Sequence, residues 1–268
     1  MSWRSWVIPP AISHWAASRN AGLTRFDDSV GSWSQALVRG SGYDSVEILA
    51  QVQSATEQVL RGEAVFERDS ILFHRAEYRW PILAGLLSVA ARDGALRVLD
   101  FGGSLGSVFW QHREFLHALD ITWGVVEQSD FVSAGKSLDQ TNVEFFATIV
   151  ECLESFAPNV ILLSSVLQYL PQPGQILQEL LDTPASTLIL DRTPMCNIDK
   201  NIVSLQVVPE HIYSASYPAW IFSHNWLIEQ LAGWDVVAEF EGIEPDGTTT
   251  GGTPFAWNGL VAKRLTHG

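Results

Sequence analysis

One short segment constrains the fold of this chain more than any other: an apolar run that leads into a glycine-rich turn. The run Leu96–Phe101 continues into Gly102-Gly-Ser-Leu-Gly106, and apolar side chains then recur every three to four residues, which predicts a helix. Glycines let the chain turn sharply and let a ligand approach the backbone. The start of a helix offers free N–H groups to an acceptor. The segment therefore predicts a strand–turn–helix unit with a binding site at its turn.

The chain after residue 95 repeats this alternation of apolar runs and amphipathic stretches, which indicates a parallel sheet covered by helices. Further buried strands are predicted at residues 122–127, 143–147, 160–165 and 187–191. The last two runs, 234–241 and 260–264, are joined by a segment rich in Gly and Thr with no helical period. A parallel crossover normally needs a helix, so these two strands should pair antiparallel. We expect an α/β fold with a seven-stranded, mostly parallel sheet and an antiparallel last strand.

Changes in pattern divide the chain into two predicted parts. Residues 1–92 are expected to form a mainly helical cap or lid, and residues 93–268 the ligand-binding domain. Within the second part, residues 194–222 are aromatic and punctuated by three prolines, so we expect a loop-like insert on the substrate side. A helix should follow at about 224–232, with Ser223 as its N-cap.

An acidic residue indicates which cofactor the turn would take. Glu127 stands 21 positions after Gly106 at the end of the next strand, where a carboxylate can accept from both hydroxyls of a ribose. A dinucleotide fingerprint needs glycine at positions 102, 104 and 107, but serine occupies the last two. Asp100 would repel a pyrophosphate and could accept a hydrogen bond from an ammonium group. We therefore predict S-adenosylmethionine (SAM), held by Asp100, Gly102, Gly103, Ser104, Gly106, Glu127, Ser164 and Ser165.

Candidate acceptor residues follow the fourth and fifth predicted strands. Gln168 and Tyr169 should line the crevice, where the Tyr169 ring could face a sulfonium or the side chain could be a buried tyrosine with one hydrogen bond. Asp191 and Arg192 could orient the substrate or form a local ion pair.

Residues 194–222 and the helix that follows them supply further candidates. His211 is the first choice as general base because histidine titrates near neutral pH; a surface or packing role is its alternative. Tyr213, assigned to the catalytic set, and Tyr217 could bind the acceptor or anchor the insert, and His224 is a further candidate for the acceptor site.

Composition excludes several classes of function. The formal net charge is −14 and no Lys/Arg cluster occurs, so a nucleic-acid substrate is not expected. The two cysteines form no metal-binding spacing, and no acids follow the fourth strand as in metal-dependent methyltransferases, so no metal is predicted. No apolar run reaches the roughly 20 residues that a bilayer span needs, and no signal peptide is recognised. These features predict a cytoplasmic protein with reduced thiols.

Several blocks in combination resemble a known family. They include Tyr78-Arg-Trp-Pro81, Val98-Leu-Asp-Phe-Gly-Gly-Ser-Leu-Gly-Ser107, Val125-Val-Glu-Gln128 and Asp191-Arg-Thr-Pro194. From about residue 65 onward the chain is similar to methyltransferases of the LIC12133 type. The resemblance implies a class I, Rossmann-like methyltransferase fold, SAM as cofactor, and Tyr78 and Gln128 as additional cofactor residues.

The combined prediction is a metal-independent methyltransferase that acts on a hydroxyl of a small molecule or glycan. A homodimer stays open. One alternative keeps the SAM site but has non-methyl chemistry or no catalysis, and another is a nicotinamide oxidoreductase. The sequence names neither the acceptor nor the role of residues 1–60.

Overall fold

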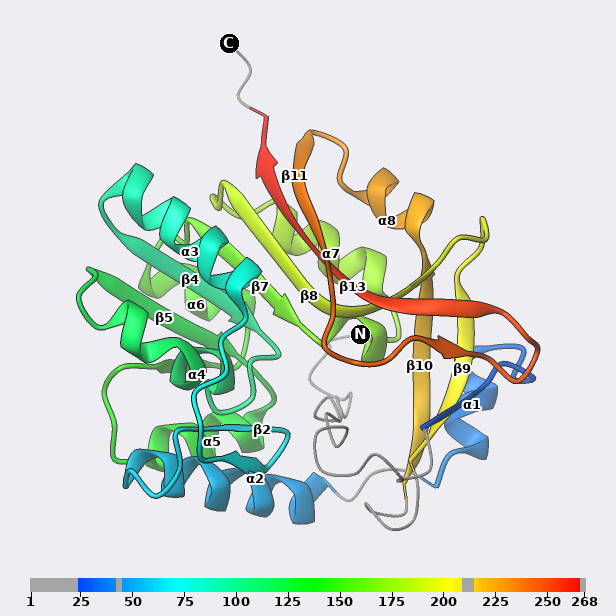
Figure 1. Cartoon of the computed structure of the whole chain (residues 1–268), viewed down its shortest axis with the longest axis horizontal. Coiled ribbons are helices and arrows are strands. Elements are labelled where there is room, and N and C mark those ends of the chain that lie inside the picture. Colours follow the sequence, from blue (N-terminus) through cyan, green and yellow to red (C-terminus); the bar gives the residue numbers. More distant parts are fainter. Residues whose placement is uncertain (1–23, 42–44, 209–214, 266–268) are drawn as a thin grey trace.

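The computed structural model describes residues 24–41, 45–208 and 215–265, which build one large sheet with helices on both faces (Figure 1). Parallel strands make up its middle and one edge, in the order β6 (Glu144–Phe146), β5 (Ile121–Val126), β4 (Leu96–Phe101), β7 (Val160–Ser164) and β8 (Thr187–Cys196). Two more strands continue this order, each antiparallel to its neighbour: β13 (Pro254–Arg264) and β11 (Trp234–Glu241).

This strand order confirms the predicted α/β fold class, with a mostly parallel central sheet and an antiparallel last strand in the chain, but the sheet has eleven strands among the described residues where seven were predicted. β4 pairs with β5 on one side and with β7 on the other. The chain therefore builds outward from β4 in one direction and then returns to build in the other. Such a switch in strand order leaves a crevice at the carboxyl ends of the strands, which is where open α/β sheets bind ligands.

Two hydrophobic layers cover the sheet, because successive strand residues point to opposite faces. Val98 belongs to one layer and Leu99 to the other. The first layer packs against α3 (Trp80–Asp93), α4 (Ser107–Leu116) and α5 (Ser129–Ser137), with α2 (Ser45–Leu60) beside α5. The second packs against α6 (Ile149–Ser155), α7 (Pro173–Leu181) and α8 (His224–Gln230). In the part of the chain that the structure describes, no helix combines the length and apolar character that a membrane span requires.

The prediction that residues 194–222 are loop-like is wrong. β8 continues to Cys196, and β9 (Ile202–Val207) and β10 (Ser216–Ser223) form an antiparallel pair that extends the sheet. Prolines had indicated a loop, yet Pro194 and Pro218 both lie inside strands and face residues of a neighbouring strand. The alternation in β9 was the missed signal: Val203, Leu205 and Val207 pack with α1 (Trp33–Arg39), while the residues between them point the other way.

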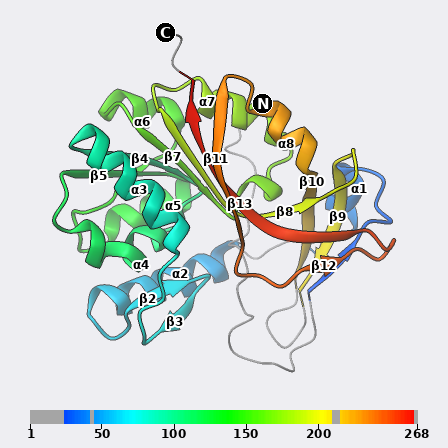
Figure 2. The same cartoon turned by 45° about the horizontal axis from the view of Figure 1, so that its top comes forward.

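The N-terminal part is not purely helical either. A hairpin of β2 (Phe66–Arg68) and β3 (Ile71–Phe73) stands between α2 and α3, and β1 (Arg25–Asp27) pairs with β9. The hairpin is closed by Asp69 and Ser70, both with positive φ (53° and 67°). Two left-handed residues are what a tight two-residue hairpin connection requires. Figure 2 shows this hairpin beside α4.

Candidate cofactor and acceptor site

A cavity that opens to solvent lies at the carboxyl ends of the parallel strands. Its walls come from the turn after β4, the start of α4, the ends of β5 and β7, the middle of β8, the β2–β3 hairpin and the start of α3. The structure brings together eight residues that the sequence predicted for the site: Gly102, Gly103, Ser104, Glu127, Ser164, Ser165, Asp191 and Arg192.

The glycine turn is held tightly from within the protein. A Cβ on Gly102, whose φ is +70°, would lie 2.3 Å from the side chain of Val166, and one on Gly103 would lie 2.4 Å from the carboxyl of Asp100. Both distances are far below van der Waals contact, so any larger residue would displace the turn. The glycines are thus required by the packing of the turn as well as by the space that it leaves for a ligand.

Asp100 lies beneath this turn, fully buried. Its Oδ2 accepts a hydrogen bond from Trp123 Nε1 (3.0 Å), whereas Oδ1 has no partner among the described residues. Burial raises the pKa of Asp100 to about 7, against the lowering effect of the Trp123 hydrogen bond. A buried acceptor without a donor is costly, so a ligand donor or a water molecule at the turn would stabilise this carboxylate.

Glu127 follows β5 and faces the cavity, only 4% exposed. Its Oε2 accepts from the backbone N–H of Gln128 (2.8 Å). Burial raises the pKa of Glu127 to about 7; backbone hydrogen bonds from Gln128 and Ser104 oppose that rise, and the charge of Asp100 adds to it. A carboxylate has about four acceptor positions, so this one is fixed in orientation and can still accept from a ligand.

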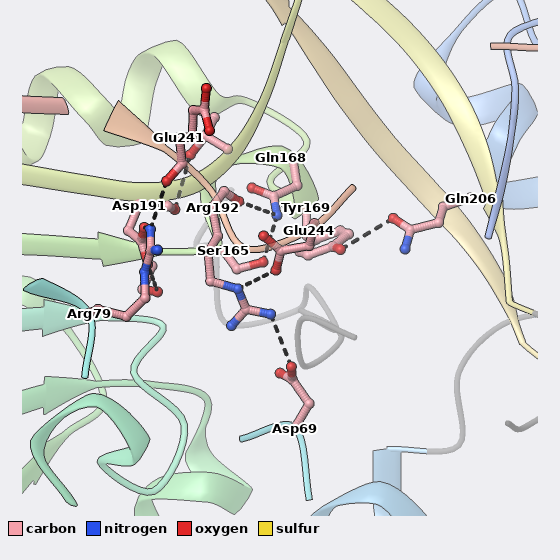
Figure 3. Close-up of polar contacts among 12 residues, drawn as sticks. Asp69, Arg79, Ser165, Gln168, Tyr169, Asp191, Arg192, Gln206, Glu241 and Glu244 are labelled. Atoms are coloured by element: carbon pink, nitrogen blue, oxygen red, sulfur yellow. Dashed lines mark hydrogen bonds and ion pairs between the residues drawn. The ribbon is translucent and has the colours of Figure 1, made fainter. Parts of the chain in front are cut away.

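On the other side of the cavity, Arg79 and Asp191 form a buried ion pair. An Arg79 Nη atom lies 2.5 Å from Asp191 Oδ1 (Figure 3). Ser164 donates its hydroxyl to the other carboxylate oxygen of Asp191 at 3.2 Å. His112 holds the Arg79 backbone, because its Nε2 accepts from the Arg79 N–H at 3.0 Å. Burial lowers the pKa of His112 to about 4, so the ring is neutral and able to accept. His112 therefore positions the arginine.

Arg192 points into the same cavity because β8 is bulged at this point. Asp191 and Arg192 together oppose Gly259 of β13, and Arg192 has φ 53°. A bulge re-aims side chains, so two consecutive residues both line the cavity instead of alternating. Arg192 pairs with Glu244 and, at 3.0 Å, with Asp69 (Figure 3). Burial disfavours its charge, but Glu244 and then Asp69 outweigh burial and raise the pKa of Arg192.

Backbone strain concentrates around this cavity. Among the described residues other than glycine, five have positive φ, and four of them line the cavity: Asp69, Ser104, Ser165 and Arg192. Such conformations cost about 1–3 kcal/mol each and are typical of functional sites. The fifth, Ser70, belongs to the hairpin turn described above.

Other predicted residues lie outside the cavity wall. Gln168 is buried and donates to Ser165 Oγ (2.9 Å), and the Tyr169 hydroxyl donates to Gln206 (3.2 Å). The ring of Tyr217 packs edge-on against that of Tyr169. His224, at the start of α8, pairs with Glu239 at 2.9 Å.

The remaining predicted residues are placed as follows. Gly106 caps α4, Gln128 precedes α5, and Tyr78 packs with Trp80 and Phe115. His211 and Tyr213 lie outside the described residues.

Sequence reasoning missed much of the wall opposite the turn. The missed residues are Glu67, Arg68, Asp69, Arg79 and Gln111, together with Glu244, the partner of Arg192. The available signal was the pair of short runs Phe66–Arg68 and Ile71–Phe73, separated by Asp69 and Ser70. Two strand-like runs joined by two turn-forming residues are typical of a β-hairpin. Among the described residues no group of three His, Cys, Asp or Glu side chains is arranged to hold a metal ion.

Comparisons with known proteins give a distant likeness only. No protein-family model matches the chain, and no curated protein matches it by sequence. The N-terminal domain of EvdMO1, solved with S-adenosylhomocysteine and D-fucose, is 17% identical with a TM-score of 0.47, over 85% of this chain and 100% of that one. The Burkholderia thailandensis 1,6-didemethyltoxoflavin-N1-methyltransferase is 16% identical with a TM-score of 0.43, over 82% and 90%. The [4+2]-cyclase SpnF is 13% identical with a TM-score of 0.45, over 92% and 98%.

A likeness at this level says nothing about which ligand the cavity takes. The resemblance to the LIC12133 type stays a prediction.

Proposed function

We propose that this chain binds SAM in the cavity and transfers its methyl group to a hydroxyl of a small molecule or glycan. The observation that carries the proposal is the position of Glu127. Its buried carboxylate faces the same cavity as the turn Gly102–Gly106 and is oriented by its own backbone neighbours. A fixed acceptor beside a glycine turn at adjoining strand ends is suited to the two hydroxyls of a ribose.

The charges around the turn fit a cationic cofactor better than a diphosphate. Asp100 and Glu127 are both buried there, and Asp100 Oδ1 is an acceptor without a donor among the described residues. An ammonium and a sulfonium would lower the pKa of both groups and favour their ionised forms. A pyrophosphate would be repelled by them. We assign cofactor binding to Asp100, Gly102–Gly106, Glu127, Ser164 and Ser165.

When bound, SAM supplies a methyl group activated by a sulfonium. The contribution of the chain is alignment, since an in-line displacement depends on the mutual position of donor and acceptor. The ion pairs Arg79–Asp191 and Arg192–Asp69 form the wall opposite the turn and limit the space for an acceptor.

A hydroxyl acceptor must also lose a proton. His211 remains our candidate for that base. Among the described residues that line the cavity, Glu67 is considered as a base because burial raises its pKa to about 7. Its oxygens already accept hydrogen bonds from the Ser107 hydroxyl and the Ser70 backbone N–H, so we do not assign this role to it.

The proposed division of the chain into functional parts is the one that the sequence predicts. Residues 1–92 act as a cap, residues 93–268 form the methyltransferase domain, and residues 194–222 lie on the acceptor side. The same proposal includes a small-molecule or glycan acceptor that is methylated on oxygen without a metal ion. It also includes a cytoplasmic location and a homodimeric state.

Ligand binding tests the proposal most directly. Titration calorimetry should show binding of SAM and S-adenosylhomocysteine, and thermal-shift assays should show stabilisation by both and not by NAD. Mass spectrometry of candidate acceptors should show one added methyl group, and His211→Ala should lower turnover with SAM affinity unchanged.

Each alternative has its own outcome. Stabilisation by NAD alone would overturn the assignment in favour of an oxidoreductase. Tight SAM binding without a methylated product across a broad acceptor panel would favour a SAM-binding protein with other chemistry.

A further inference from the structure

Three arginines line the cavity, and one of them has no acidic partner among the described residues. Arg79 is paired with Asp191 at 2.5 Å, and Arg192 with Asp69 at 3.0 Å. The third, Arg68, forms no ion pair or side-chain hydrogen bond with any residue of 24–41, 45–208 or 215–265, although its side chain lines the cavity. The guanidinium carries five N–H donors and no acceptor. Arg68 thus presents to the cavity a cation whose donors are not taken up by side chains of the described residues.

Aromatic rings hold Arg68 in place. Its guanidinium carbon lies 5.4 Å from the ring centre of Phe66 and 5.0 Å from that of Phe73. The two rings face each other across the β2–β3 hairpin, stacked at 4.4 Å with planes 8° apart. Cation–π contacts of this kind stabilise a cation but satisfy none of its hydrogen-bond donors. The side chain is therefore fixed in position while its donors remain available.

The surroundings of Arg68 favour an added anion. Burial lowers the pKa of Arg68, and the neighbouring charge of Arg192 lowers it further. An arginine stays charged in spite of such shifts. The protein therefore holds a half-buried cation without an acidic partner among the described residues, which is energetically unfavourable. Asp69 opposes this lowering most, followed by Glu244 and Glu77, but none of these acids forms an ion pair with Arg68. A ligand carboxylate beside Arg68 would compensate this charge.

The hairpin lies where it can meet a ligand bound at the glycine turn. Glu67, the residue before Arg68, accepts a hydrogen bond from the hydroxyl of Ser107, the first residue of α4. This contact ties β2 to the helix that begins at the turn, and Figure 2 shows the hairpin beside α4. Arg68 and the turn are therefore parts of one cavity wall.

We infer that Arg68 binds a carboxylate of a ligand in this cavity. The inference deepens the proposed function and rests on it. The carboxylate has two sources, the amino-acid part of the cofactor or an acidic group on the acceptor. Arg79 and Arg192 each pair with an acid of the protein, although Arg79 Nε has no hydrogen-bond partner among the described residues. Arg68 is the arginine of the cavity that has no acidic partner among the described residues.

The first experiment compares two nucleosides. S-adenosylhomocysteine carries the amino-acid carboxylate, and 5′-methylthioadenosine has the same nucleoside thioether without it. Calorimetry measures the Kd of each for the wild type, Arg68→Met, Arg68→Lys and a matched control, Arg61→Met, which changes an exposed arginine paired with Glu63. If the cofactor supplies the anion, Arg68→Met should weaken S-adenosylhomocysteine about tenfold or more, with 5′-methylthioadenosine unchanged and Arg68→Lys between the two.

The second experiment tests the acceptor as the source. Succinate is titrated into protein saturated with S-adenosylhomocysteine; if the acceptor supplies the anion, the wild type and Arg61→Met should bind it and Arg68→Met should not. Unchanged S-adenosylhomocysteine affinity in Arg68→Met, together with no Arg68-dependent succinate binding, would overturn the inference.

Failure of the proposed function is recognised separately. A wild type that binds neither nucleoside would refute SAM binding. Succinate is then titrated into the protein alone: binding that is lost in Arg68→Met supports the role of Arg68, and binding that is absent or unchanged refutes it.

Discussion

The two sides of the cavity are built in different ways. The turn side, formed by Asp100–Gly106 and Glu127, comes from one continuous piece of chain, two neighbouring strands and the helix between them. The arginine side, formed by Arg79 and Arg192 with their acids, joins residues up to 123 positions apart. Backbone groups fix the turn side, whereas buried ion pairs fix the arginine side. We therefore expect changes on the turn side to alter ligand affinity and changes on the arginine side to alter stability.

Arg192→Met should have the largest effect and tests the arginine side. The substitution leaves Asp69 and Glu244 buried without their cation, and breaking a buried pair in this way costs about 3–5 kcal/mol. Urea unfolding followed by circular dichroism measures the loss. Arg39→Met is the control: Arg39 pairs with Asp27 at 2.7 Å and is 47% exposed, so the expected loss is below about 1 kcal/mol. Similar losses in both variants would show that burial of the Arg192 pairs adds nothing.

Glu127→Ala tests the turn side, and the expected change is in binding. Loss of an ionised acceptor for ligand hydroxyls should weaken S-adenosylhomocysteine by about 1–3 kcal/mol in calorimetry. The unfolding free energy at pH 8 should not fall, because the variant removes a buried carboxylate whose charged form is disfavoured. Glu114→Ala, on the exposed face of α4, is the control for a change of charge alone. Unchanged ligand affinity in Glu127→Ala would place the ribose elsewhere.

The raised pKa of Glu127 predicts that both protein stability and ligand affinity depend on pH. The folded pKa of about 7 lies above the ordinary glutamate pKa of 4.5, so the neutral form stabilises the free protein fully below about pH 4.5. This contribution is lost as pH rises through 7, with a limiting slope of about 1.4 kcal/mol per pH unit. Ligand affinity should change in the opposite sense, because the ionised carboxylate is the better acceptor, and should rise between pH 6 and 8.

Unfolding curves and calorimetry on the wild type and Glu127→Gln check both trends. Asp100 and Glu67 titrate in the same window, so the difference between the two proteins is the quantity to compare. An equal pH dependence in both would contradict the assignment to Glu127.

Ser70→Gly should have the smallest effect. Ser70 holds φ 67° in the hairpin that carries Asp69 and Arg68, and glycine adopts that conformation without a Cβ clash. The left-handed conformation costs a residue with a Cβ roughly 1–2 kcal/mol, and the extra backbone entropy that glycine loses on folding offsets about 0.5–1 kcal/mol of this. We therefore expect a net stabilisation of at most about 1 kcal/mol in urea unfolding, with S-adenosylhomocysteine affinity unchanged. A loss of affinity would show that the hairpin, and not only the pairs of Arg192, sets the shape of the cavity.

Sequence was sufficient for the turn side because its signals are local. The run before Gly102, the helical spacing after Gly106 and the carboxylate at position 127 each depend on neighbours within about one supersecondary unit. The structure places the glycine turn and Glu127 directly after β4 and β5, which are neighbouring parallel strands.

The arginine side could not be derived in this way, because pairs such as Arg79–Asp191 depend on how distant segments meet. The bulge that turns Arg192 into the cavity depends on the register between β8 and β13. No sequence period encodes either feature. Strands β9 and β10 were missed for a different reason: the prolines of residues 194–222 were taken to indicate a loop, although Pro218 lies within β10 and faces Leu205.

β8 has a mechanical consequence for the whole molecule. Its ten residues pair with β7 and β13 and, at Met195 and Cys196, with β10, so one strand crosses from the parallel half of the sheet into the half made by β9 and β10. A hinge between the two halves would have to bend this strand and break its ladder. The two halves should therefore move as a single body, and any opening of the cavity must come from the surface connections above it, with the β2–β3 hairpin and the segment after β11 as the moving parts.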